Sequence, residues 1–323
     1  MNEIDDAQVI ETIKGIHFKI VKEISNKVHS NYNPNIISED IEVGGDISYD
    51  IDVKAESIII DTLSNLKGDY SITLVMEGLG EKEIRSGNGK GYKIIFDPID
   101  GTREIMYDKR SAWILTGISE ISSTSLKNIN VAIQTEIPTK KQDSFSFLIG
   151  IRNKGSFEEI YSKSTFNLVS SKKRLKTSDS EQLKDGFVCF PNPFPGTKIQ
   201  IAKSYETFYK KIFPKSNVND AKVFSDEYIS SGGQIYLLAS GRYRIVADIR
   251  AFVQNDINSL CCHPYDICTG LIATEAGAIL IDLKNNRIEY PLDTATNCDW
   301  IGFSNYAIYE KYCNELLESI TKD

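Results

Sequence analysis

Two aspartates stand three residues apart in the stretch of the chain that most clearly suggests chemistry, residues 96–102, which read FDPIDGT. Apolar residues 94–96 predict a strand that delivers both carboxylates into a turn punctuated by proline and glycine. The proline fixes one backbone angle between the acids, and the glycine after the second acid removes a side chain. Asp97, Asp100 and the carbonyl of Ile99 could therefore face one point, and such an all-oxygen arrangement suits Mg²⁺.

The two residues after the second aspartate could add a phosphate contact. Gly101 and Thr102 stand where the next segment begins. Their backbone amides are therefore free to meet a phosphate oxygen. A plain turn from strand to loop is the alternative explanation of this heptad taken alone.

Further carboxylates lie at three other predicted element ends. Glu77 follows a short buried strand, residues 72–76, and a second strand ending in Asp97 nearby would complete a metal site. Asp52 and Glu56 share one face of a helix that opens near Asp52. An acidic first turn that complements the helix dipole is the alternative for that pair.

The last candidate carboxylate, Asp266, opens a helix predicted over residues 267–276. An N-cap and a metal ligand are equally easy to build at this position. His263 is the more obvious catalytic residue by type, but the preceding cysteines and the following proline favour a structural role.

The remaining pattern predicts two halves of mixed α and β structure. A polar, lysine-rich stretch at residues 170–185 predicts a surface connection. We therefore expect an N-terminal metal-binding α+β domain, residues 1–184, and a C-terminal α/β domain, residues 185–323, that supplies Asp266 and substrate contacts. Helices are expected at 6–29, 201–213 and 232–241, and strands at 113–118, 131–137, 145–151, 186–190 and 243–248.

Composition narrows the classes of function. The 323 residues are 41% hydrophobic and 25% charged, which is typical of a soluble globular protein. A net charge of −8 argues against nucleic acid as a partner. No apolar run approaches the ~20 residues that cross a bilayer, so no membrane partner is expected. The six cysteines form no CxxC pair and no signal peptide is visible, so we predict reduced, mostly buried thiols and a cytoplasmic location.

Three segments together resemble the inositol monophosphatase / fructose-1,6-bisphosphatase superfamily of metal-dependent phosphomonoesterases. Residues 97–102 resemble its central signature, residues 264–277 its second signature, and residues 52–56 its Asp-x-x-x-Glu element. The order and spacing agree from about residue 45 to the end of the chain. The resemblance implies an α/β fold, a layered αβαβα sandwich with the active site between its two halves.

The resemblance also implies a role for each matched residue. Asp97 would bridge two metals, with the other ligands Glu77, the Ile99 carbonyl, Asp100 and Asp266, and the site would hold two or three Mg²⁺ ions. Thr102 and Asp52 would orient and activate the attacking water, so the implied catalytic set is Asp52, Thr102 and Glu77. The amides of Gly101 and Thr102 would hold the phosphate.

This chain departs from the family pattern in two places. The family commonly has two adjacent glutamates where this chain has Glu77-Gly78. Either Glu77 reaches the metal after a small shift, or the first metal site is weakened. A basic stretch also follows the central signature, and we hypothesise that Arg103, Lys109 or Arg110 contacts an anionic substrate. A solvated basic loop is the alternative.

The prediction is thus a Mg²⁺-dependent phosphomonoesterase that uses metal-activated water on a small phosphorylated polyol, sugar or nucleotide. The resemblance suggests inositol monophosphate, fructose-1,6-bisphosphate or 3′-phosphoadenosine 5′-phosphate as substrate, and a homodimer. Substrate choice would depend on residues 230–233 and 259–263. The alternative is a catalytically silent homologue that binds a metal or a phospholigand as a regulator, which the unusual Gly78 favours.

Overall fold

Two large sheets organise the computed structural model, which describes residues 7–29, 36–39, 47–214, 222–254 and 260–321. The first sheet has eight strands in the order β10-β9-β8-β7-β6-β5-β3-β4, and the second has five in the order β12-β11-β13-β15-β14. The first comprises β3 Tyr70–Met76, β4 Gly80–Arg85, β5 Lys90–Asp100, β6 Ala112–Glu120, β7 Val131–Ile137, β8 Ser144–Ile151, β9 Gly155–Ser162 and β10 Leu168–Arg174. The second comprises β11 Gly186–Cys189, β12 Val223–Asp226, β13 Tyr243–Asp248, β14 Ile279–Ile281 and β15 Trp300–Phe303.

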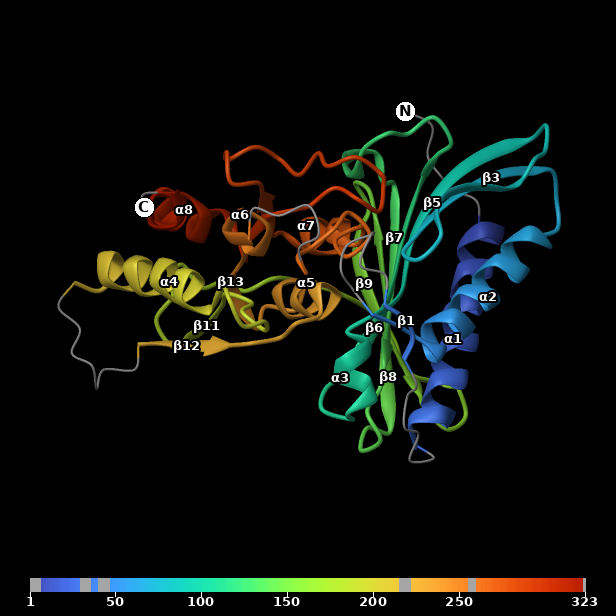
Figure 1. The fold of residues 1–323 in the computed structure, drawn as a ribbon, viewed down its shortest axis with the longest axis horizontal. Coiled ribbons are helices and arrows are strands. Elements are labelled where there is room, and N and C mark those ends of the chain that lie inside the picture. The colour runs from blue at the N-terminus through green and yellow to red at the C-terminus, as the bar shows by residue number, and fades with distance from the viewer. Residues whose placement is uncertain (1–6, 30–35, 40–46, 215–221, 255–259, 322–323) are drawn as a thin grey trace.

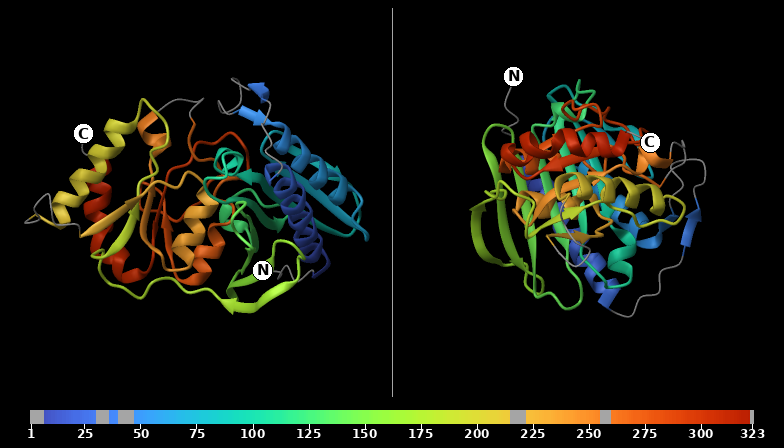
Figure 2. Two further views of the ribbon diagram at one scale, coloured as in Figure 1. Left: turned by 90° about the horizontal axis from the view of Figure 1, so that it is seen from below. Right: turned by 90° about the vertical axis from the view of Figure 1, so that its left-hand side faces the viewer.

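Helices cover both sheets and fill the space between them, which gives five layers (Figure 1). The helices are α1 Ala7–His29, α2 Asp50–Ser64, α3 Thr102–Met106, α4 Lys198–Ile212, α5 Ser231–Ala239, α6 Arg250–Gln254, α7 Gly270–Ala276 and α8 Tyr306–Thr321. Figure 2 shows α1 and α2 on the outer face of the large sheet and α4 and α8 beyond the small one. A 3₁₀ turn, Leu126–Asn128, and a two-stranded pair, β1 Ile36–Glu39 with β2 Ile47–Tyr49, complete the described elements. The predicted αβαβα sandwich is confirmed.

Three hydrophobic cores hold these layers together: one under the outer helices of each sheet and one in the middle layer between the sheets. In the first core, Ile13, Ile16, Ile20 and Ile24 of α1 are fully buried. Their spacing of three and four residues puts them on one helical face, as the sequence predicted. The middle core joins both sheets through α5 and α7, so the two halves are packed against each other.

Three expectations about local structure need correction. The strand that ends the central motif runs on to Asp100, so the turn begins only at Gly101. The helix near the second signature begins at Gly270, and Asp266 lies in a turn before it instead of capping it. Residues 168–174 form the edge strand β10, whose residues are all exposed, because a strand with few buried side chains has the composition of a loop.

Other expectations about the chain have mixed outcomes. The eight-stranded sheet ends at Arg174 and the five-stranded sheet begins at Gly186, and the domain boundary between residues 184 and 185 stays a prediction. All six cysteines are buried and lie outside disulfide bonds. Within the described ranges, no helix has both the length and the apolar composition needed to cross a membrane.

Candidate active site

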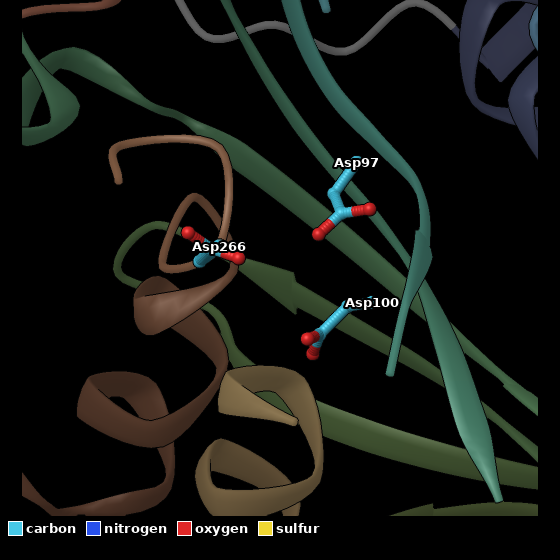
Figure 3. Close-up of side chains that lie close together, drawn as sticks. All are labelled: Asp97, Asp100 and Asp266. Atoms are coloured by element: carbon cyan, nitrogen blue, oxygen red, sulfur yellow. The ribbon is translucent and has the colours of Figure 1, made fainter. Parts of the chain in front are cut away.

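Three aspartates from two distant parts of the chain converge at one end of β5. Figure 3 shows Asp97 and Asp100 on this strand and Asp266 facing them from the turn before α7. One carboxylate oxygen of each lies within 4.8 Å of the others. Asp97 is 1% exposed and Asp100 is 7% exposed.

An irregularity in β5 lets two residues at an odd spacing share one side of the strand. Successive side chains of a regular strand alternate, so residues three apart would point to opposite faces. The register of β5 with β6 shifts between Asp97 and Asp100, as it does at a β-bulge. The Ile99 amide also donates to Asp97 Oδ1 at 3.0 Å. The proline-containing motif thus ends the strand with both carboxylates on the same side.

Asp100 is anchored by the start of α5, a contact that the sequence reasoning missed. Ser230 Oγ and the Gly232 amide both donate to Asp100 Oδ2 at 2.6 Å. A Cβ on Gly232 would lie 2.9 Å from that oxygen, so only glycine fits this close approach. One sequence feature could have indicated this contact: residues 230–233, two serines followed by two glycines, stand at the start of a predicted helix. The sequence analysis assigns these residues to substrate choice.

Asp266 is braced within its own turn. The backbone amide of His263 donates to Asp266 Oδ2 at 2.6 Å. The His263 ring is buried and stacks on Tyr265, with ring centroids 5.3 Å apart. His263 therefore supports the turn that aims Asp266, as its predicted structural role requires.

Burial and like charge act together on these carboxyls. Burial, followed by the charges of Glu77, Asp100 and Asp266, raises the pKa of Asp97 well above its ordinary value. Burial and the charge of Asp266 raise the pKa of Asp100 to about 7, although the Ser230 and Gly232 donors oppose the shift. Deprotonating this cluster is costly unless a cation joins it. The donor set of carboxylates and one carbonyl fits Mg²⁺.

The predicted water-activating pair is in contact. Thr102 Oγ1 lies 3.1 Å from Asp52 Oδ1 and 2.8 Å from the Ile99 carbonyl oxygen. The hydroxyl has one proton, so at any moment it donates to only one of these acceptors. Asp52 lies in the first turn of α2 and Thr102 begins α3, so the contact joins two helices 50 residues apart.

One pocket of about 550 Å³ brings together most of the predicted residues. Those that line it are Asp52, Glu77, Asp97, Ile99, Asp100, Gly101, Thr102, Arg103 and Asp266. Residue 259 lies outside the described residues, while Leu260, Cys261 and His263 line the pocket with Ser231. The structure thus joins the three sequence segments at one place.

Where the family commonly has a second glutamate this chain has Gly78, and the side chain of Glu56 lies beside it. Gly78 has a φ of +75°, and a Cβ on it would lie 2.6 Å from Glu56 Oε1. Burial raises the pKa of the Glu56 carboxyl to about 7. The place beside Gly78 is therefore filled by a carboxyl from α2, and both residues line the pocket.

The three basic residues after the motif separate in the structure. Lys109 Nζ pairs with Glu104 at 3.2 Å, and the Arg110 guanidinium pairs with Asp226 at 2.8 Å. Among the three, Arg103 lines the pocket. Lys109 and Arg110 therefore already form ion pairs with carboxylates of this chain. The hypothesis of a contact with an anionic substrate is kept for Arg103.

Comparisons with known proteins agree with this geometry. The model of the inositol monophosphatase family matches residues 8–321. Among solved structures, the MJ0109 gene product, described as an inositol monophosphatase–fructose 1,6-bisphosphatase, superposes with a TM-score of 0.68 at 18% identity, over 96% of this chain and 98% of that one. A fructose-1,6-bisphosphatase of Leishmania major gives 0.71 at 12% identity, over 99% and 96%.

A third solved structure, the extragenic suppressor protein suhB of Bartonella henselae, gives a TM-score of 0.66 at 16% identity, over 97% of this chain and 98% of that one. At these identities the superpositions show a shared fold. No curated protein matches the sequence.

Proposed function

Because the chain belongs to the inositol monophosphatase family, we propose that it is a Mg²⁺-dependent phosphomonoesterase. Its substrate would be a small phosphorylated polyol, sugar or nucleotide. The observation that carries the proposal is the convergence of Asp97, Asp100 and Asp266, whose oxygens lie within 4.8 Å of one another in a pocket. A homodimer and a cytoplasmic location stay predictions.

The proposed ligands are Glu77, Asp97, the Ile99 carbonyl, Asp100 and Asp266. Like-charged carboxyls that are buried together favour a divalent cation, which offsets both their burial and their mutual repulsion. Bound Mg²⁺ would supply a nucleophilic hydroxide at neutral pH, neutralise phosphate oxygens and stabilise the leaving alkoxide. Glu77 lies close enough to Asp97 to raise its pKa, which supports including it despite the following glycine.

Thr102 and Asp52 would move the proton of the attacking water. A threonine hydroxyl is a poor base by itself, but it can pass its own proton to Asp52 Oδ1 while it accepts one from water. The 3.1 Å separation of these oxygens suits that transfer. The alternative acceptor of the same proton, the Ile99 carbonyl oxygen, lies 2.8 Å away, so the hydroxyl stands beside the acidic cluster.

The start of α3 would hold the phosphate. The first amides of a helix have no partner within it, and α3 begins at Thr102. Gly101 has a φ of +91°, a left-handed conformation that favours glycine. This residue turns the chain from β5 into α3, and its amide with that of Thr102 would face the substrate.

Phosphate release from a panel of sugar, inositol and nucleotide phosphates tests the proposal. We expect one class of ester to be hydrolysed only with Mg²⁺, and Asp97→Asn to abolish that turnover. Asp179→Asn is the matched control, because Asp179 is a surface residue paired with Lys176. Mg²⁺ binding without turnover of any ester would contradict the enzyme and favour the regulator. Turnover that persists in Asp97→Asn would contradict the assigned site.

A further inference from the structure

A second cavity, of about 620 Å³, lies on the other side of the turn that carries Asp266. Its lining shares no residue with the acidic pocket. It is framed by the end of β6, the 3₁₀ turn, α5, α7 and β15. Its volume falls in the ordinary range of small-molecule sites, roughly 300–1,000 Å³.

Apolar side chains form part of the wall of this cavity beside polar and charged ones. Leu126, Ile129, Ile235 and Leu271 contribute to the wall. Trp300 also lines the cavity and is 1% exposed, and its buried Nε1 has no hydrogen-bond partner among the described residues. A buried indole N–H normally finds an acceptor.

The lining of the cavity contains more basic than acidic side chains. They are Lys127, Arg152 and Arg287 on the basic side and Glu120 and Glu289 on the acidic side. Lys127 and Glu289 pair with each other at 2.8 Å, which leaves two guanidinium groups and one carboxylate.

Both arginines line the same cavity. Burial lowers the pKa of Arg152; the negative charge of Glu275 opposes this shift, and the positive charge of Arg287 adds to it. Arg152 Nε and Nη2 both donate to the Ile129 carbonyl, and Nη2 also donates to the Lys127 carbonyl. Arg287 has no recorded ion pair among the residues that the structure describes. Glu275, the other acid near Arg152, accepts from the amides of Asn153 and Gly155. Adjacent guanidinium groups are a favourable setting for one anionic group.

We propose that this cavity is a second ligand site, which takes a small amphiphilic anion with an aromatic or branched apolar body and a single acidic group. The apolar body would lie against Leu271 and Trp300, and the anion would meet Arg152 and Arg287. Backbone hydrogen bonds between residues 124–126 and 290–292 join the two segments that carry the lining residues Leu126 and Glu289.

Contacts lead from this cavity to the acidic pocket. Ile267, Cys268 and Leu271 line the cavity, and Asp266, immediately before them, lines the pocket. Within the same turn, the Thr269 hydroxyl donates to Gln134 Oε1 at 2.9 Å. Gln134 Nε2 in turn donates to the carbonyl of Gly232 at 2.7 Å, whose amide binds Asp100. Occupation of the cavity would therefore change Mg²⁺ affinity. This coupling rests on the proposed function, whereas the ligand site does not.

Titration of the metal-free protein with anilinonaphthalene sulfonate tests the site, because this fluorescent probe has the proposed chemistry. We expect one saturable site. Arg287→Glu should weaken binding by about tenfold, as expected for losing one charge-assisted contact. Lys284→Glu is the matched control, since Lys284 is exposed, lies three residues away and is not in the lining. Probe binding that is absent, or equal in both variants, would overturn the proposal.

A steric variant places the probe in the cavity. Thr274 is exposed on α7 and lines the cavity, so Thr274→Trp should block entry without disturbing the core. Ser164→Trp, on an exposed turn outside the lining, should bind the probe as the wild type does. Unchanged binding in Thr274→Trp would overturn the location.

The coupling has its own measurement. Mg²⁺ affinity measured by calorimetry with and without saturating probe should differ by about fivefold or more in the wild type, and should not differ in Thr274→Trp. Equal Mg²⁺ affinities in the wild type would overturn the coupling. Failure of Mg²⁺ to bind at all would refute the proposed metal site instead, and the probe titration would still decide the cavity.

Discussion

Two buried polar clusters lie on opposite faces of the eight-stranded sheet, and only one of them is satisfied by its neighbours. Beneath α1, the fully buried His17 contacts Thr135 through Nδ1 and Thr116 through Nε2, both at 2.8 Å. Its ring also meets Phe96, at 5.6 Å between centroids. The next residue along β5 is Asp97, whose side chain takes the other face, where three carboxylates converge.

The two clusters respond to burial in different ways. Burial lowers the pKa of His17 to about 3, so the ring is neutral and its two nitrogens are matched by two hydroxyls. Burial raises the pKa of Asp97 and Asp100, and neighbouring carboxylates add to the shift. The His17 cluster needs no ligand, because both ring nitrogens already have hydrogen-bond partners. The three carboxylates could hold a metal ion, and the proposed ion is Mg²⁺.

Asp97→Asn is the strongest test of this contrast. Removal of a charge worth several kcal/mol to the transition state should reduce kcat/KM by about 10³-fold or more. The metal-free variant should be at least as stable as the wild type in denaturant, because one of three repelling buried carboxyls is gone. If Asp97→Asn loses stability and keeps activity, Asp97 has a structural role like that of His17 and is not a metal ligand.

The water-activating pair should show a smaller effect that spares metal binding. Thr102→Ala should reduce kcat by about 10²–10⁴-fold, the range for loss of general-base assistance. Calorimetry should find its Mg²⁺ affinity unchanged. Thr62→Ala, which removes a hydroxyl from the distal part of α2, serves as the control. Equal activities in the two variants would remove Thr102 from the mechanism.

The histidine cluster predicts a pH dependence of stability. His17 has a pKa of about 3 when folded and about 6.5 when unfolded. Its contribution is therefore complete above pH 6.5 and falls by about 1.4 kcal/mol per pH unit below it, or about 2 kcal/mol at pH 5. The raised pKa values of Asp97, Asp100 and Glu56 act in the opposite direction, but they do so in the wild type and in His17→Gln alike. Urea unfolding of both proteins at pH 7 and pH 5 should therefore show the loss as a difference: between these pH values the wild type should lose about 2 kcal/mol relative to His17→Gln. An equal change in the two proteins would contradict the neutral, buried ring.

Alanine variants of Gly78 and Gly80 test whether the Glu56 side chain lies beside Gly78. Gly78 and Gly80 both have a φ of +75°, but a Cβ meets Glu56 only at Gly78 and meets nothing within 4 Å at Gly80. Each alanine variant should lose about 1 kcal/mol through backbone strain. Gly78→Ala should lose more, and Glu56→Ala in the same chain should remove the excess. Identical losses in unfolding experiments would show that Glu56 does not occupy this place.

Local pattern predicted much of this molecule. The spacing of isoleucines predicted α1, and short motifs identified Asp52, Asp97, Thr102 and Asp266 before their contacts were known. These features depend on neighbouring residues, which a sequence displays directly.

Contacts between distant residues were not visible in the sequence. Ser230 and Gly232 hold Asp100 across about 130 positions. The exposed edge strand β10 has a lysine-rich composition that also fits a loop. Arg110 finds its carboxylate partner in Asp226, more than 100 residues away, so its charge could not be assigned from the motif alone.

Calorimetric titration of Mg²⁺ into the wild type and into Asp97→Asn, at pH 6 and pH 8, tests the central claim most directly. The raised pKa values of Asp97 and Asp100 mean that protons compete with the cation at the lower pH. We predict binding that is tighter at pH 8, that releases protons, and that is lost in Asp97→Asn but kept in Asp179→Asn. Absence of Mg²⁺ binding by the wild type, or equal binding by Asp97→Asn, would contradict the assignment of this cluster as the metal site.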